Sequence, residues 1–177
     1  VRPEWPNQPI DLFAPGVDSG TYDYFTEAIV GKEHASRGDV TSSEDDNVLV
    51  QGVANNKYAL GFFGMAYYLE NKNKLNAVKI DDGDEANGKG AQPPSVENVI
   101  KGVYQPLARP LFIYVRKDSA QRLIVKQFIT FYLNNAAELA SEVGYVKLPA
   151  EIYGLAKARF NKNTTGSIFA GGGSKVG

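Results

Sequence analysis

Two kinds of hydrophobic pattern alternate along the first part of the chain. Residues 10–13 alternate apolar and polar side chains, with the period of two that is typical of a half-buried strand. Helical spacing follows in Tyr24, Phe25, Ala28 and Ile29. The order repeats when a short apolar run at residues 59–64 predicts a buried strand and residues 65–69 a helix. Strands that alternate with helices predict an α/β fold.

Two more strands and three long helices are predicted after residue 73. Residues 74–80 and 111–115 are expected to form strands, and the latter is the most strand-like segment in the sequence. Apolar residues at helical spacing then predict three helices, over residues 119–135, 136–143 and 150–160.

The boundary between the first predicted strand and helix holds Ser19, Gly20 and Thr21. A serine or threonine at such a boundary can cap free backbone N–H groups, and a glycine lets the backbone approach a ligand closely. Two interpretations are open at this point: an ordinary capped turn, or a cradle for an anion at the start of the helix.

An acidic run, Glu44 to Asp46, precedes the apolar face of another predicted helix. Consecutive positions point to different sides of a helix, so these carboxylates cannot flank one bond as a catalytic pair. Acids at this position stabilise the positive end of the helix dipole. Ser95 is expected to cap a further short helix over residues 95–102.

Composition excludes several classes of function. The 177 residues are 43% hydrophobic, which is typical of a globular protein, and the net charge of −1 argues against a nucleic-acid-binding protein. The chain has no cysteine and a single histidine, His34, so neither a disulfide framework nor a Cys/His zinc site is expected. With one histidine and no G-x-S-x-G motif, Ser19 is a poor candidate for a hydrolytic nucleophile.

Charge is distributed unevenly along the chain. Residues 1–102 carry 9 Lys+Arg and 16 Asp+Glu, a net of −7, whereas residues 103–177 carry 10 and 4, a net of +6. This change predicts a domain boundary near residues 102–103. The chain begins without methionine, and its first ten residues contain three prolines, which suggests an internal piece of a longer polypeptide.

Four segments together carry a family resemblance: DLFAPGVDSGTYDYFTEAI, SRGDVTSSEDDNVLVQGV, ALGFFGMAYY and YQPLARPLFIYV. Their order and spacing resemble the phosphate-binding protein of bacterial phosphate ABC transporters, the PstS type. The resemblance implies the type II periplasmic-binding-protein fold, an α/β fold with two lobes whose mixed sheets are flanked by helices.

The resemblance also implies an arrangement of lobes. Residues 1–104 correspond to lobe two with the SGT anion loop, and residues 105–177 to a hinge strand and the C-terminal return of lobe one. The first segment of lobe one is absent from this sequence, so the same parent chain or a second chain would have to supply it. We therefore expect the apolar faces of the C-terminal helices to pack against that segment.

Site residues follow from the family motif. In the family, the SGT loop donates hydrogen bonds to phosphate, which implies this role for Ser19, Gly20 and Thr21. Many relatives place an arginine a few residues earlier, where this chain has Pro15. Arg37 is the candidate replacement, because a guanidinium can grip two oxygens of an anion at once. The alternative for Arg37 is an ordinary surface residue.

The implied function is the capture of inorganic phosphate between two lobes for delivery to an ABC transporter permease. It requires no catalytic residue, cofactor, metal or nucleic acid, and it implies a periplasmic or extracellular location, with or without an anchor in the cell envelope. The alternative is an interaction, adhesion or sensor module that retains the fold without transporting phosphate.

Overall fold

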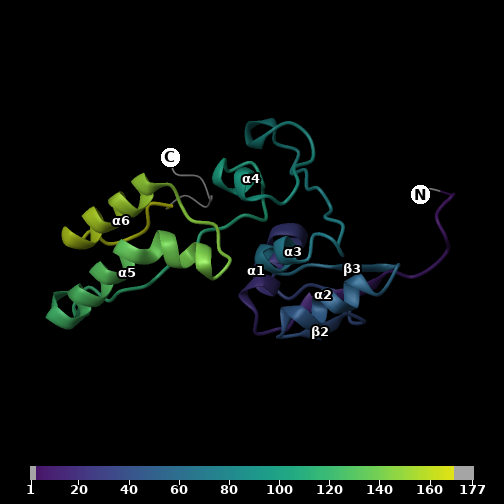
Figure 1. The fold of residues 1–177 in the computed structure, drawn as a ribbon, viewed down its shortest axis with the longest axis horizontal. Coiled ribbons are helices and arrows are strands. Elements are labelled where there is room, and N and C mark those ends of the chain that lie inside the picture. The colour runs from purple at the N-terminus through teal and green to yellow at the C-terminus, as the bar shows by residue number, and fades with distance from the viewer. Residues whose placement is uncertain (1–2, 170–177) are drawn as a thin grey trace. The chain divides into compact units, whose positions relative to one another are not determined.

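The computed structural model describes residues 3–169, in two compact units, Val1–Val78 and Lys79–Gly177 (Figure 1). The first unit combines a small sheet with helices, and the second consists of helices and irregular segments. The lobe boundary expected between residues 104 and 105 stays a prediction. The two units are compact groups of residues, whereas the expected lobes are defined by where the chain crosses from one lobe to the other.

A three-stranded parallel sheet forms the centre of the first unit. β1 (Asp11–Pro15) lies between β2 (Thr41–Ser43) and β3 (Ala59–Gly61), and Phe13 is opposite both Thr41 and Gly61. The strands predicted from the alternating pattern and the apolar run are confirmed as β1 and β3. β2 was not predicted, because its three polar residues become a strand through pairing with β1.

One helix follows each strand of this sheet. They are α1 (Gly20–Val30), α2 (Asp46–Ala54) and α3 (Met65–Glu70). Leu49 and Val50 of α2 are completely buried, and α2 contacts both β1 and β3. Gly52 allows this close contact, since a Cβ there would lie 2.2 Å from the Phe13 ring. The predicted α/β fold is thus confirmed in the first unit, with a sheet that is parallel throughout.

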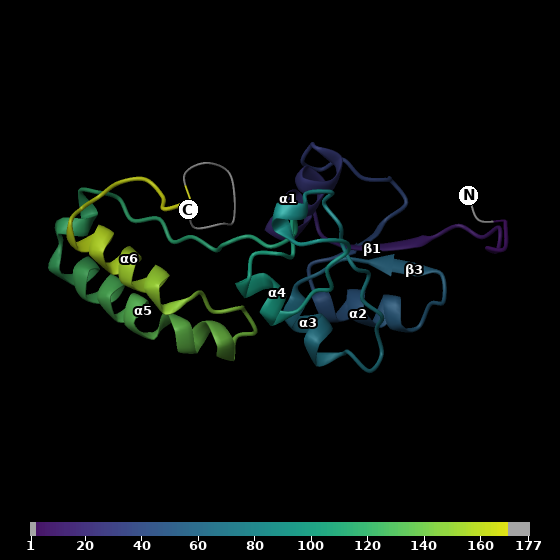
Figure 2. The same cartoon turned by 90° about the horizontal axis from the view of Figure 1, so that it is seen from above.

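The connections place the starts of the three helices at one edge of the sheet. Parallel strands end at a common edge, and each strand leads directly into its helix through a short loop. In Figure 2, β1 and β3 lie side by side with α2 and α3 next to them. This edge gathers the positive ends of three helix dipoles.

Two long helices dominate the second unit. α5 (Leu123–Glu142) and α6 (Ala150–Asn161) pack side by side in both views (Figures 1 and 2), with Ile129 and Ile152 buried. The short α4 (Val96–Ile100) begins at Ser95, whose Oγ accepts the Asn98 N–H at 3.1 Å, as predicted. Two 3-10 turns, Glu85–Asn87 and Ser119–Gln121, complete the described elements of this unit.

Two predicted strands are wrong. Residues 74–80 contribute one isolated bridge, between Ile80 and Gln92, and residues 111–115 are irregular and mostly exposed. A strand needs a neighbour to satisfy its N–H and C=O groups. Between residues 79 and 169 no strand is present to pair with residues 111–115, so their apolar composition is not sufficient.

The separate helix predicted over residues 136–143 is also wrong, because α5 continues through residue 142. The side chain of Asn135, at the expected break, donates to the Phe131 carbonyl at 2.7 Å and so stays within the helical pattern. The helix ends before Gly144, whose φ of +81° suits glycine. The predicted helix over residues 150–160 is confirmed as α6.

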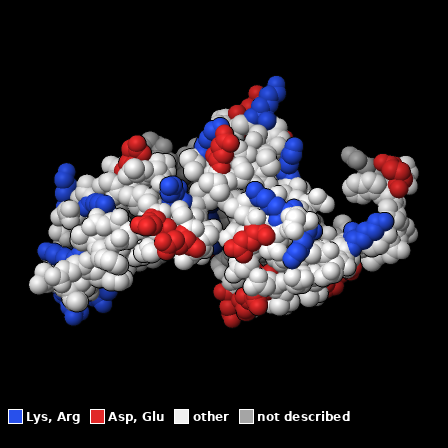
Figure 3. Space-filling view, viewed as in Figure 1, with Lys and Arg blue, Asp and Glu red and all other residues white. Residues whose placement is uncertain are grey.

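Part of the apolar surface of α5 is exposed in the second unit. Phe131 is 61% exposed, and Leu123, Ile124 and Phe128 are exposed to a similar extent. On the face shown in Figure 3, acidic and basic side chains both occur on each unit, with uncharged areas between them. The described residues therefore leave this apolar surface uncovered.

Candidate anion-binding site

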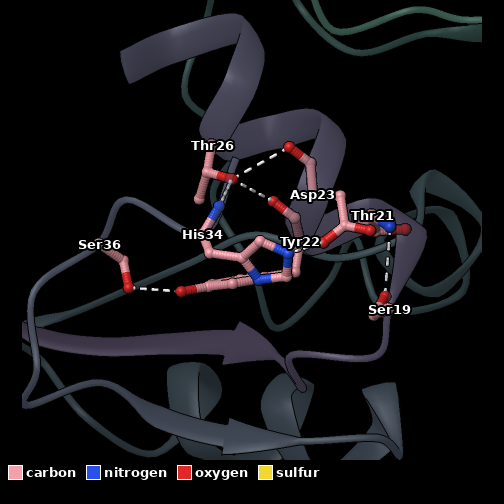
Figure 4. A network of polar contacts seen from close by, with 7 residues as sticks. All are labelled: Ser19, Thr21, Tyr22, Asp23, Thr26, His34 and Ser36. Atoms are coloured by element: carbon pink, nitrogen blue, oxygen red, sulfur yellow. Dashed lines mark hydrogen bonds and ion pairs between the residues drawn. The ribbon is translucent and has the colours of Figure 1, made fainter. Parts of the chain in front are cut away.

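Helix α1 begins where the sequence predicts, with Ser19 as its N-cap residue. Ser19 has an extended backbone, and its Oγ accepts the Thr21 N–H at 3.2 Å (Figure 4). The Ser19 N–H donates to the Gly16 carbonyl at 3.0 Å, which closes the loop between β1 and α1. Ser19 Oγ accepts one bond here and retains its own O–H as a donor.

The three helix starts at this edge differ in charge. Asp45 caps α2 by accepting the Asn47 N–H at 2.9 Å, and the Asp46 carboxylate accepts the Gly64 N–H, before α3, at 3.4 Å. Two of the starts are therefore covered by carboxylates of the chain itself. The cap of α1 is a neutral hydroxyl, and the acid in its first turn, Asp23, lies 3.4 Å from His34 Nε2.

Two acidic residues near this edge, Asp46 and Glu44, contact other loops of the first unit. Burial raises the pKa of the Asp46 carboxyl, although the hydrogen bond from Gly64 acts in the opposite direction. The side chain of Glu44 lies against Gly16, where a Cβ would be only 1.6 Å from Glu44 Oε1. A side chain at residue 16 would therefore require the Glu44 side chain to move. The acidic run of Glu44 to Asp46 serves the helix start and the packing of the loop, as its spacing indicates.

Arg37 lies in the connection between α1 and β2, not directly before a helix. Its Nε donates to Asp39 Oδ1 at 2.9 Å, and its Nη2 donates to Asp39 Oδ2 at 2.5 Å. This hydrogen bonding raises the pKa of Arg37 and lowers the pKa of Asp39. The arginine side chain is half exposed, and the charge of Asp11, the first residue of β1, acts on it as well, so Arg37 lies on the side of the sheet where the strands begin. The role of Arg37 in anion binding stays a prediction.

Polar contacts join α1 to this connection, and the sequence did not predict them. Thr26, which is 2% exposed, donates to the backbone carbonyls of Tyr22 and Asp23 and accepts the His34 N–H at 2.9 Å. The Tyr22 hydroxyl lies 2.6 Å from Ser36 Oγ (Figure 4). The signal in the sequence is that Tyr22 and Thr26 are four residues apart, so both lie on one face of the predicted helix.

His34 and Ser19 do not contact each other. His34 Nε2 lies 3.4 Å from Asp23 Oδ1, while Ser19 Oγ is engaged by the Thr21 N–H, so the two side chains have different partners. Between residues 3 and 169, no group of His, Asp and Glu side chains is arranged to hold a metal ion. The helices in that range are too short or too polar to span a membrane.

Comparisons with known proteins define the class. The family model of the PBP superfamily domain matches residues 3–136, so this chain belongs to that superfamily. It is 53% identical to protein SphX of Synechococcus elongatus over 171 residues, which are 97% of this chain and 49% of SphX. It is 37% identical to the phosphate-binding protein PstS of Staphylococcus haemolyticus over 154 residues, 86% of this chain and 46% of that protein.

A solved structure agrees with these relatives. The crystal structure of a possible phosphate binding protein from Planctomyces limnophilus matches with a TM-score of 0.77 and 42% sequence identity. The match covers 93% of this chain and 57% of that one. The chain thus spans about half the length of the curated relatives it matches. The resemblance found in the sequence motifs is confirmed at the level of the family.

Proposed function

We propose that this chain is the phosphate-binding part of a solute-binding protein that captures inorganic phosphate and delivers it to an ABC transporter permease. The observation that carries the proposal is the start of α1, which the neutral hydroxyl of Ser19 caps, whereas carboxylates of the chain cover the starts of α2 and α3. The names of the PstS and Planctomyces relatives support phosphate as the anion.

Binding requires no covalent chemistry. In this proposal, first-turn N–H groups of α1 and the hydroxyls of Ser19 and Thr21 donate to phosphate oxygens, and Arg37 adds a charged donor. The protein is a binding protein and not an enzyme. It acts in the periplasm or outside the cell, where it meets the permease, and a second lobe closes over the ligand.

Calorimetry with phosphate and with sulfate tests this function in the natural full-length protein. We expect measurable phosphate binding and clearly weaker sulfate binding. Equal affinity for the two anions, or no binding of either, would overturn the proposal.

Replacing Arg37 by lysine should weaken phosphate binding about tenfold, the cost of one charge-assisted hydrogen bond. Lysine keeps the charge but loses the planar two-pronged grip. Arg116→Lys is the matched control, because Arg116 pairs with Asp118 two residues later in the same way, at 3.2 and 2.6 Å. If calorimetry gives equal phosphate affinities for the two variants, Arg37 is an ordinary surface residue and does not bind the anion.

The exposed face of α5 is proposed to pack against the rest of a two-lobe protein, supplied by the same parent chain or by a second chain. We expect the 177-residue polypeptide by itself to associate as its concentration rises, because large apolar patches are rarely left in water. Sedimentation velocity should show weaker association for Phe128→Ser/Phe131→Ser than for Leu155→Ser on α6. A polypeptide that stays monomeric and cooperatively folded would contradict this.

An interaction, adhesion or sensor module without phosphate transport is the second candidate. One observation favours it: a buried proline, Pro15, stands where the family places an arginine. Mass analysis of anions released from freshly purified full-length protein separates the two candidates. Retained phosphate supports transport, whereas a phosphate-free protein that also fails in calorimetry supports the module.

A further inference from the structure

Positive charge gathers at one end of the helical pair that α5 and α6 form. The turn before α5 lies beside the end of α6, because the Gln121 side chain donates to Asn163 Oδ1 at 2.9 Å. Residues 116–126 and 157–163, which we call the basic end, carry seven Lys+Arg and one acid, Asp118. In Figure 3, blue surface lies mainly at the left end of the second unit. The basic end therefore has a formal net charge of +6.

The chain itself neutralises little of this charge. Arg116 pairs with Asp118 through two hydrogen bonds, at 3.2 and 2.6 Å, and this pair uses the one acid of the basic end. Lys117 and Lys126 are both exposed, and within residues 3–169 neither of them forms an ion pair. These cations are therefore available to an external partner of negative charge.

The opposite end of the helical pair is acidic. Residues 138–151, which include the end of α5 and the start of α6, carry three glutamates and one lysine. Residues 1–102 carry a net charge of −7. A negatively charged surface would therefore attract the basic end and repel these other parts of the chain, which favours one orientation of the second unit on such a surface.

An exposed leucine lies within the basic end. Leu123 is 70% exposed in the first turn of α5, directly after Arg122 and three residues before Lys126. Cations beside an exposed apolar side chain are typical of helices that bind at the boundary between lipid headgroups and acyl chains. This combination favours a lipid bilayer over an acidic protein, for which the cations alone would be sufficient. The surface proposed to pack against the rest of the protein, with Phe128 and Phe131, begins about one turn further along α5.

We propose that the basic end of the second unit docks onto the surface of a bilayer that contains anionic phospholipids. Each lysine or arginine near such a surface adds attraction, and the attraction falls off within a screening length. Leu123 enters the headgroup boundary beside these cations. Docking holds the protein at the kind of surface in which a permease lies. The inference does not require that the chain binds phosphate.

Co-sedimentation of the natural full-length protein with lipid vesicles tests the inference. We expect stronger binding to vesicles that contain phosphatidylglycerol than to vesicles of phosphatidylcholine alone. Raising the salt concentration from about 0.1 M to about 1 M shortens the screening length from about 10 Å to about 3 Å, so it should remove most of this difference. Equal binding to the two kinds of vesicle at low salt would overturn the inference.

Charge-reversal variants assign the binding to the basic end. Lys117→Glu/Lys126→Glu should weaken binding to the anionic vesicles about tenfold or more, and Lys117→Gln/Lys126→Gln should weaken it less. Lys32→Glu/Lys74→Glu is the matched control, because these two exposed lysines of the first unit give the same change in net charge. This control should retain most of the binding. Equal losses in the two charge-reversal variants would overturn the inference, since the net charge of the protein would then govern binding.

An acidic surface of a permease is the alternative occupant of the basic end. If Lys117→Glu/Lys126→Glu bound anionic vesicles normally but lost binding to the permease in uncharged bilayers, the inference would be wrong. Neither lysine belongs to the candidate anion site, so the variant should keep the circular dichroism spectrum and the phosphate affinity of the unaltered protein. If the unaltered protein binds anionic vesicles but no phosphate, the proposed function fails and this inference stands.

Discussion

Leu49→Ala should lower the free energy of unfolding by about 2–5 kcal/mol, the usual cost of emptying a leucine-sized space in a packed core. Leu49 is 0% exposed, and its helix α2 contacts β1 and β3 at the centre of the first unit. Relaxation around the space should be limited, because Gly52 already brings α2 close to the Phe13 ring. Urea unfolding followed by circular dichroism measures the change.

Val48→Ala provides the control on the same helix. Val48 is 50% exposed, so its truncation should cost well under half as much as that of Leu49. Comparable losses in the two variants would contradict the assignment of Leu49 to the core. A loss of less than about 1 kcal/mol in Leu49→Ala would contradict it too.

Thr21→Ala should weaken phosphate binding by roughly 1.5–3 kcal/mol, which is about tenfold to over a hundredfold. The change removes one hydroxyl donor but leaves the Thr21 N–H and its bond to Ser19 Oγ in place. Thr21 is a cleaner test than Ser19, since Ser19 also caps the helix and its loss would cost stability. Calorimetry on the natural full-length protein gives the affinity.

Two further variants limit how this result is interpreted. Thr21→Ser keeps the hydroxyl and should retain most of the affinity. Thr130→Ala, on the exposed surface of α5, should leave phosphate binding unchanged. If Thr21→Ala binds phosphate as tightly as the unaltered protein, the SGT loop is not the anion site.

Local signals were sufficient for part of the fold. The SGT stretch predicted the start of α1, because a serine cap and its N–H partner are only two residues apart in the chain. Alternation predicted β1, and helical spacing predicted most of α5. The strand at residues 111–115 was predicted wrongly, because apolar composition reports a tendency and not the presence of a neighbouring strand. β2 was missed because its residues are polar, although β1 is present to pair with them.

Part of the candidate site could likewise be predicted from the sequence, and part could not. Ser19, Gly20 and Thr21 are contiguous, so a motif could point to them. The Tyr22 to Ser36 bond joins residues fourteen positions apart and depends on the left-handed turn at His34. No periodicity reports such a contact. The contrast between the neutral cap of α1 and the carboxylates at α2 and α3 likewise requires the strand order, because only the parallel sheet brings the three starts to one edge.

The central claim is that phosphate binds at the start of α1, and a crystal structure of the natural full-length protein grown with phosphate tests it most directly. Our account predicts phosphate oxygens within about 2.7–3.2 Å of donors on Ser19, Gly20 and Thr21. A phosphate bound elsewhere, with no anion at the start of α1, would contradict it.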